Sequence, residues 1–385
     1  MRKPPLPPAI APILERLGEE DRQRLLAVLA RVGQVDDEEY LPWDKLRFKT
    51  PPEGMTRDEW WVAIKLARSS SGRRLPLFAT DGSPFSYALP DEILRMTEEI
   101  SRRASGYIAL PEPVTNPATR DRYVVNSLIE EAIKSSQLEG ASTSRKVAKE
   151  MIRSGRRPKD RSEKMILNNY NAMRRVVELR DSDLSPDLVC ELHRIVTDGT
   201  LDDPEAAGRI QSSADPADRV AVWGWGFDDE PVHSPPPSEQ LEERLANLCR
   251  FANSSDDKPW IQPVLRALTL HFMAGYDHYF EDGNGRTARI LFYWGMLRHG
   301  YWLTEFLSIS NILVCAPAKY GRSYIYTEQD DGDLTYFFLY QLKVIIRSID
   351  ELDKYLARKV GELSGNQSSP ICGSGRVQLS TAGAP

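Results

Sequence analysis

Apolar residues recur at helical spacing through most of the chain, and this pattern predicts a mainly α-helical fold. The predicted helices with the clearest apolar stripes cover residues 120–139, 164–179, 185–196, 238–251, 263–276, 286–298 and 333–360. Strands do not alternate with helices, so a helical bundle is favoured over a doubly wound parallel sheet.

Capping residues mark several helix ends. Ser185 precedes Pro186, the usual order of an N-cap and the first helical position, and Ser238 is a second candidate N-cap. Gly140 is placed as the C-terminal stop of the helix over residues 120–139.

The first 115 residues form a mixed α/β region of unassigned role, punctuated by prolines. We expect helices at residues 18–35, from an N-cap at Thr56, and at 91–105, with a hairpin around Asp81-Gly82. Residues 219–227 alternate like a strand and precede a proline cluster, so they are predicted to form a small β-hairpin flap on the bundle.

The same patterns divide the rest of the chain into four parts. A helical segment covers residues 116–143, a basic connector 144–161, the main helical core 162–360, and a Ser- and Gly-rich tail, predicted to be disordered, 361–385. The connector carries eight positive and two negative side chains; a solvated face is favoured over a patch for an acidic partner.

Composition excludes several classes of protein. The 385 residues contain 50 Lys and Arg against 56 Asp and Glu, a net charge of −6 that disfavours a general nucleic-acid-coating role. The four cysteines show neither a CxxC pair nor a Cys/His cluster, which indicates a reducing compartment. Prolines interrupt the N-terminus and no apolar run is long enough to span a membrane, so a cytoplasmic protein without membrane contact is predicted.

The chemistry is concentrated between His278 and Arg289. Gly283, Asn284 and Gly285 join two apolar helices, so backbone N–H groups and a helix N-terminus can face an anion there. Arg286 and Arg289 are three residues apart and can reach further phosphate oxygens from one helix face.

Two more residues indicate the reaction type. Asp282 supplies a hard oxygen ligand suited to Mg²⁺ shared with phosphate, and His278 can accept a proton near neutral pH. Together with the cradle, they predict phosphoryl or nucleotidyl transfer to a hydroxyl group.

Residues 278–289 resemble the HxFx[DE]GNGRxxR signature of the Fic-domain family (filamentation induced by cAMP), with Tyr279 where proline is commonest. The resemblance covers roughly residues 120–350. It implies a Fic-type helical bundle and a protein adenylyltransferase, a nucleotidyltransferase that moves AMP from ATP to a hydroxyl side chain of a target protein.

The resemblance also implies a role for each motif residue. His278 is the expected base, and Asp282 the ligand of Mg²⁺. Asn284, with the backbone of Gly283 and Gly285, stabilises the α-phosphate, while the β- and γ-phosphates lie on the two arginines, Arg286 and Arg289. The flap would clamp the target by strand-like pairing.

An inhibitory helix is implied as well. Residues 135–140 fit the family's [ST]xxxE[GN] pattern, and their position before the core resembles class II members. Glu139 would pair with Arg289 and leave ATP in an unproductive pose. Ser135, four residues earlier, would support the Glu139 carboxylate.

Other readings stay open at this point. The same fold could transfer another nucleotide or phosphate-bearing group, or remove AMP with Glu139 positioning a water molecule. A different class is a nucleotide-gated protein-interaction module without turnover. ATP and a target protein, the chain itself included, are the expected partners; DNA binding is disfavoured, and a homodimer is left open.

Overall fold

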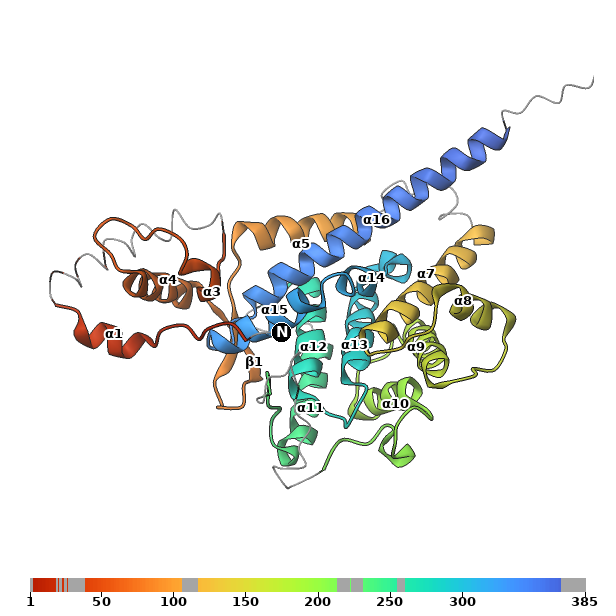
Figure 1. The fold of residues 1–385 in the computed structure, drawn as a ribbon, viewed down its shortest axis with the longest axis horizontal. Helices are drawn as coiled ribbons and strands as arrows, with labels where there is room; N and C mark the ends of the chain where they lie inside the picture. Colours follow the sequence, from red (N-terminus) through yellow and green to blue (C-terminus); the bar gives the residue numbers. More distant parts are fainter. Residues whose placement is uncertain are drawn as a thin grey trace, which may run out of the picture.

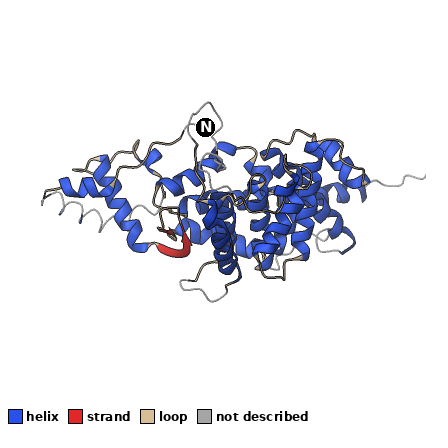
Figure 2. Ribbon diagram, turned by 90° about the horizontal axis from the view of Figure 1, so that it is seen from below, coloured by secondary structure: helices blue, strands red, loops and turns tan. Residues whose placement is uncertain are grey.

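A computed structural model describes residues 3–18, 20, 23, 26, 39–105, 117–212, 222, 231–254 and 260–367 of the chain. The described part is predominantly helical with one small antiparallel hairpin, which confirms the predicted fold class (Figures 1 and 2). No helix in these ranges is both long and apolar enough to cross a bilayer.

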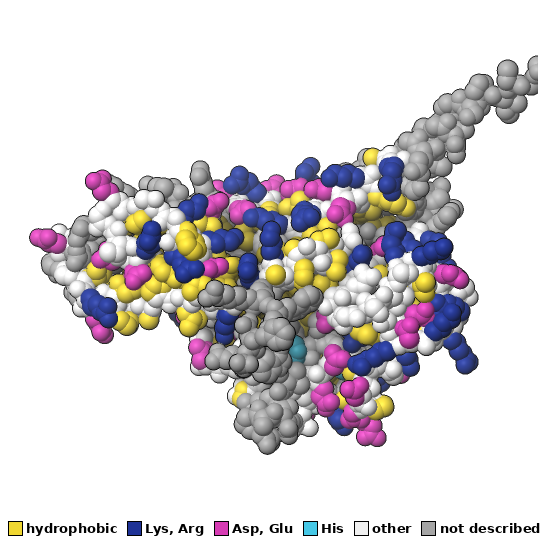
Figure 3. Space-filling view, viewed as in Figure 1, with side chains coloured by type: hydrophobic (Ala, Val, Ile, Leu, Met, Phe, Trp, Pro, Cys, Tyr) yellow, Lys and Arg dark blue, Asp and Glu magenta, His cyan; other side chains and the backbone are white. Residues whose placement is uncertain are grey.

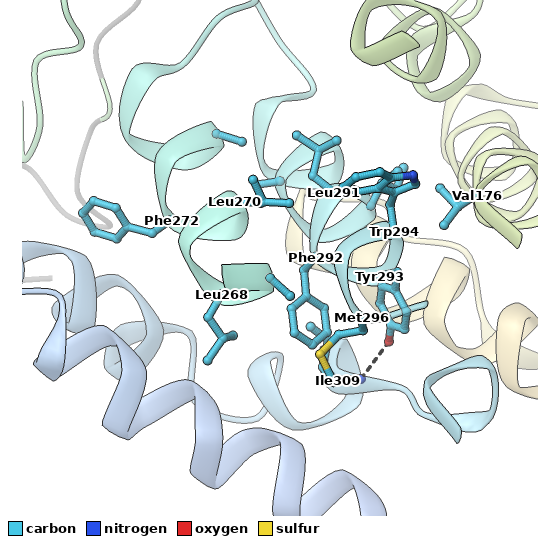
Figure 4. Close-up of a cluster of buried hydrophobic side chains, with 14 of the residues drawn as sticks. Val176, Leu268, Leu270, Phe272, Leu291, Phe292, Tyr293, Trp294, Met296 and Ile309 are labelled. Carbon is cyan, nitrogen blue, oxygen red and sulfur yellow. Dashed lines mark hydrogen bonds between the residues drawn. The ribbon is translucent and has the colours of Figure 1, made fainter. Parts of the chain in front are cut away.

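Two buried helices form the centre of the core: α12 (Pro263–Asp277) and α13 (Asn284–Arg298). Six residues join them, so the two helices run antiparallel, side by side, as a helical hairpin. At Gly295 an added Cβ would lie 3.0 Å from the Cβ of Ala267, and this close approach requires a glycine. Figure 4 shows Leu270 of α12 close to Leu291 of α13 between the two helices, while Phe272 and Trp294 point outward on opposite sides of the pair.

Five other helices pack around this pair. They are α7 (Pro117–Leu138), α9 (Arg161–Glu178), α10 (Pro186–Thr197), α11 (Ser238–Asn253) and α16 (Thr335–Gln367). Ser185 caps α10 as predicted, accepting a hydrogen bond from the backbone N–H of Leu188. Ser238 is not an N-cap: Pro237 holds that position, and Ser238 is the first helical residue.

Most of the N-terminal region lies at one end of the bundle, on the left in Figure 1, and its last helix lies along α16. It contains α1 (Ile10–Arg16), α3 (Trp43–Leu46), α4 (Arg57–Ser71), β1 (Arg73–Phe78), β2 (Pro84–Tyr87) and α5 (Asp91–Ala104). Thr56 begins α4 with a full capping box, and β1 pairs with β2 around the predicted Asp81-Gly82 turn. A buried ion pair of 2.5 Å between Lys65 and Asp330 ties α4 to the bundle.

Short elements fill the remaining connections. They are α8 (Arg145–Ser154), α14 (Ile309–Leu313), α15 (Pro317–Gln329) and the 3₁₀ helices Pro204–Ala206 and Trp302–Phe306. Much of the basic connector is therefore the helix α8, whose charged side chains are mainly exposed, as expected of a solvated face.

Three predictions fall partly or wholly outside the described residues. Most of the helix at 18–35 and most of the flap at 219–227 lie there; at the flap, Val222 forms an isolated antiparallel bridge with His233. The tail was predicted to be disordered from residue 361, but α16 continues to Gln367; residues 368–385 are outside the described part.

Candidate active site

The loop between α12 and α13 is held in a sharply turned conformation. His278 and Gly283 both have positive φ angles, +51° and +82°. The side chain of Asn284 closes the loop on the Phe280 peptide: Oδ1 accepts from the N–H at 3.0 Å, and Nδ2 donates to the carbonyl at 2.6 Å. Asn284 was predicted to stabilise the α-phosphate, but its amide group is engaged in shaping the loop.

The hydrogen bonds of His278 fix its tautomer. Nδ1 lies 3.0 Å from the carbonyl oxygen of Gly275, which can only accept, so Nδ1 carries the proton. Burial lowers the pKa of His278 below the ordinary 6.5, so the ring is neutral at pH 7. The Nε2 atom of this ring therefore presents a lone pair.

Gln211 fastens the same loop from outside the motif. Its side-chain amide donates to the carbonyl of His278 at 2.5 Å, and its backbone N–H donates to the carbonyl of Tyr279 at 2.9 Å. Sequence reasoning missed this residue because a single glutamine in a connecting segment carries no pattern.

A second histidine braces the loop from α10. His193 is fully buried, its Nδ1 accepts from the backbone N–H of Gly208 at 2.9 Å, and its Nε2 donates to the carbonyl of Asp282 at 2.8 Å. The ring stacks on Phe280 with 3.7 Å between centroids. Burial lowers the pKa of His193 to about 4 and keeps it neutral. His193 is therefore a hydrogen-bonded core residue, and Phe280 anchors the loop in the core.

The two motif arginines are buried beneath the loop. Arg286 donates from Nη1 to the carbonyl of Val196 at 2.9 Å, and its Nε has no hydrogen-bond partner within the described residues. Burial lowers the pKa of Arg286. Arg289 donates from Nη2 to Glu139 Oε1 at 2.7 Å and from Nε to Ser135 Oγ at 2.8 Å. Burial opposes its charge, but the Glu139 carboxylate outweighs that effect and raises the pKa of Arg289.

Glu139 lies directly over the first turn of α13. A Cβ built on Gly285 would be 2.3 Å from Glu139 Oε1, so the carboxylate occupies the space that the glycine leaves open. A carboxylate at this helix N-terminus takes the position where an incoming anion would meet the backbone N–H groups and Arg289.

Ser135, predicted to support the Glu139 carboxylate, contacts Arg289, which is also the partner of Glu139. The Ser135 hydroxyl and carbonyl oxygens both accept hydrogen bonds from Arg289, at 2.8 and 3.0 Å. Ser135 lies in the last turn of α7 and Glu139 follows its end, and the guanidinium group of Arg289 hydrogen-bonds to both.

Asp282 lies at the exposed edge of the loop, with 54% of its side chain accessible. Its Oδ1 accepts from the backbone N–H of Gly283, and Oδ2 is 3.8 Å from Arg161 Nη2. The described residues contain no group of three or more His, Cys, Asp or Glu side chains placed to hold a metal. Since Mg²⁺ keeps several waters and prefers phosphate oxygens, one accessible carboxylate fits a magnesium ion shared with a nucleotide.

Gly283→Ala is expected to destabilise the fold by about 2–5 kcal/mol. The positive φ costs a side chain about 1–2 kcal/mol, and overpacking adds about 1–3, because the new Cβ would lie 2.6 Å from Thr197 Cγ2. Gly300→Ala is the matched control: its φ is +80°, but nothing lies within 4 Å of the added atom. Urea unfolding midpoints measure both; equal losses would show that contact with Thr197 is unimportant.

These features define a helical protein with two buried arginines beneath a tight loop that carries a neutral histidine. Residues 183–296 match the model of the Fic/DOC family, so the chain contains a Fic domain, and the match lies within the predicted core.

Known relatives agree with this assignment. Over 119 residues the chain is 32% identical to protein adenylyltransferase fic-1 of Caenorhabditis elegans, covering 31% of this chain and 20% of that protein. It is 27% identical over 118 residues to protein adenylyltransferase Fic of Nematostella vectensis, covering 31% of this chain and 26% of that protein. The match therefore spans about a quarter or less of the length of these curated relatives.

A solved structure supports the fold. A Fic family protein from Desulfovibrio desulfuricans superposes with a TM-score of 0.54 at 19% identity, covering 74% of this chain and 78% of that one.

Proposed function

We propose that this protein is a protein adenylyltransferase that transfers AMP from ATP to a hydroxyl side chain of a target protein. The observation that carries the proposal is the neutral His278, with its Nε2 lone pair available, on the loop that opens a helix with two buried arginines. The adenylyltransferases of C. elegans and N. vectensis, similar over the same domain, lend further support.

The proposed step is a displacement at the α-phosphorus. Nε2 of His278 takes the proton of the target hydroxyl, whose oxygen then bonds to the α-phosphorus. The bond between that phosphorus and the oxygen bridging to the β-phosphate breaks, and pyrophosphate leaves with the electron pair. General-base help of this kind is worth about 10²- to 10⁴-fold in rate.

The remaining residues would bind and orient the nucleotide. The free Nε of Arg286 and the N-terminus of α13 suit phosphate oxygens, and Arg289 would reach the terminal phosphates once it is released. Asp282 would hold Mg²⁺ jointly with the phosphates, and the ion would neutralise charge on the leaving pyrophosphate.

Glu139 would act as the brake on this reaction. Its carboxylate satisfies Arg289 and fills the space above Gly285, so a nucleotide cannot place its terminal phosphates on that arginine while the ion pair persists. Only Arg289 is deeply buried; the Glu139 side chain is 30% exposed, so the carboxylate can swing away at lower cost.

The test compares ATP labelled at the α- or γ-phosphate. Glu139→Gly protein is incubated with Mg²⁺, each labelled ATP and a cell extract as the source of targets, and labelled proteins are counted after denaturation. Label from α-labelled ATP alone, lost in Glu139→Gly/His278→Ala, is expected. Label from γ-labelled ATP would instead indicate phosphate transfer and overturn the proposal.

A further inference from the structure

A second charged groove lies between the N-terminal region and helices α15 and α16, away from the loop of the candidate active site. It has a volume of about 440 Å³, within the range of small-molecule sites. Figure 3 shows Lys and Arg side chains gathered over the middle of the molecule, where α15 and the first half of α16 lie in Figure 1.

Cations dominate the rim of this groove. Lys45, Lys319, Arg322 and Lys343 line it, against the two carboxylates of Glu39 and Glu92. Lys343 pairs with Glu92 at 2.7 Å, whereas Lys45, Lys319 and Arg322 form no ion pair with the described residues. The Nε atom of Arg322 is enclosed and has no hydrogen-bond partner in the described part of the chain. An enclosed guanidinium N–H without a partner favours the binding of an anion that can accept its hydrogen bond.

The floor of the groove is aromatic and apolar. Tyr326, Tyr336 and Tyr340 line it together with Leu339 and Pro42. The Tyr326 and Tyr336 hydroxyls are already bound, to Asp44 and Asp330, so these side chains chiefly offer ring surface. Rings beside cations suit a ligand that combines a flat base with phosphates.

The walls disfavour a peptide. None of the lining residues belongs to a strand, and most lie in α15 and α16, whose backbone groups are engaged within the helices, so these walls offer no strand edge to an extended segment. An amphipathic helix would require an apolar trough, and four Lys and Arg side chains stand here instead. We infer that this groove is a second binding site, for a nucleoside polyphosphate, independent of the proposed transfer reaction.

The groove can be altered without touching the Fic loop. Helix α15 lies between the groove and α12. On one side Ser323 and Tyr326 line the groove, and on the other Tyr320 and Tyr324 hydrogen-bond to His271 in α12. Substitutions at Lys319, Arg322 and Tyr340 therefore leave the residues assigned to the reaction in place.

The test is the number of ATP molecules bound per chain, measured by equilibrium dialysis of the full protein with labelled ATP. We expect Lys319→Ala/Arg322→Ala to lose one bound equivalent relative to wild type. The charge-matched control Lys146→Ala/Arg157→Ala alters two exposed cations elsewhere and is expected to lose none. Tyr340→Leu is expected to weaken the same equivalent about tenfold, since one stacked base is worth roughly that factor or more.

Each other result overturns the inference. Equal ATP stoichiometry in wild type and Lys319→Ala/Arg322→Ala would show that ATP does not bind in the groove. Equal losses in both double variants would show that ATP is held only by the general positive charge of the surface. Inorganic tripolyphosphate that binds as tightly as ATP, unaffected by Tyr340→Leu, would show an anion site without base recognition. Displacement of ATP by an oligoglutamate peptide but not by GTP would assign the groove to an acidic protein segment.

The same measurement keeps the two proposals apart. If one equivalent of ATP binds in the groove while no AMP transfer is found, only the proposed function fails.

Discussion

Glu139→Gly is expected to raise transfer of AMP by about 10- to 100-fold. The bond from Arg289 to this carboxylate is charged and largely desolvated, and such bonds are worth about 1.5–3 kcal/mol, or roughly that factor in an equilibrium. Removing the carboxylate frees the guanidinium group and clears the space over Gly285. Initial rates of label incorporation from α-labelled ATP, at fixed protein and Mg²⁺, give the ratio.

Two further variants isolate the cause. Glu150→Gly removes an exposed carboxylate on α8 by the same substitution and is expected to leave the rate unchanged. Glu139→Gln keeps the size of the side chain but not its charge, so an intermediate rate is expected. An unchanged rate in Glu139→Gly, with ATP binding intact, would contradict the brake.

The sequence predicted best those features that depend on neighbouring residues. The Thr56 N-cap, the Ser185-Pro186 helix start and the Asp81-Gly82 turn are set within a few positions, and all three form as expected. The order of motif residues likewise predicted the pairing of Glu139 with Arg289, because a family pattern carries the long-range information that periodicity lacks.

Features that depend on contacts distant in sequence were predicted less well. His233 lies near a proline cluster, yet it is buried, with Nδ1 bonded to Glu328, 95 residues away, and Nε2 to the carbonyl of Tyr276. The bracing of the loop by Gln211 depends in the same way on a partner far along the chain. Helix α15 was missed because its tyrosines, spaced among charged residues, form no apolar stripe.

The sequence also did not predict the direction in which some side chains of the site point. Spacing predicted that Ser135 and Glu139 share a helix face, but α7 ends at Leu138, and Arg289 from α13 hydrogen-bonds to both residues. Nor could spacing show that Asn284 turns back to the Phe280 peptide rather than toward a ligand. Composition alone cannot resolve either choice, because both depend on which polar groups become buried together.

His278→Ala is expected to lower AMP transfer about 10²- to 10⁴-fold in the Glu139→Gly background, the usual contribution of a general base. The Nδ1–H bond to Gly275 directs Nε2 outward, and alanine removes that acceptor while leaving the arginines in place. His299→Ala, which alters a half-buried histidine at the far end of α13, is the control and should retain full activity. ATP affinity is measured in parallel, and a parallel loss of binding would show that His278 acts through the loop's structure instead.

The pH profile of the Glu139→Gly protein tests the same histidine without mutation. Burial lowers the pKa of His278 below 6.5, and only the neutral ring can accept a proton, so kcat/KM should stay constant as pH falls from 8 to 6.5 and decline only below it. His193 titrates near 4 and remains neutral throughout. Burial disfavours the charged form of His233, but Glu328 outweighs burial and raises the pKa of this histidine above 6.5. Titration of His233 would therefore not produce a loss of activity below pH 6.5. An acid limb centred at or above 6.5 would mean that the base is a solvated histidine, and would exclude the buried ring of His278 from that role.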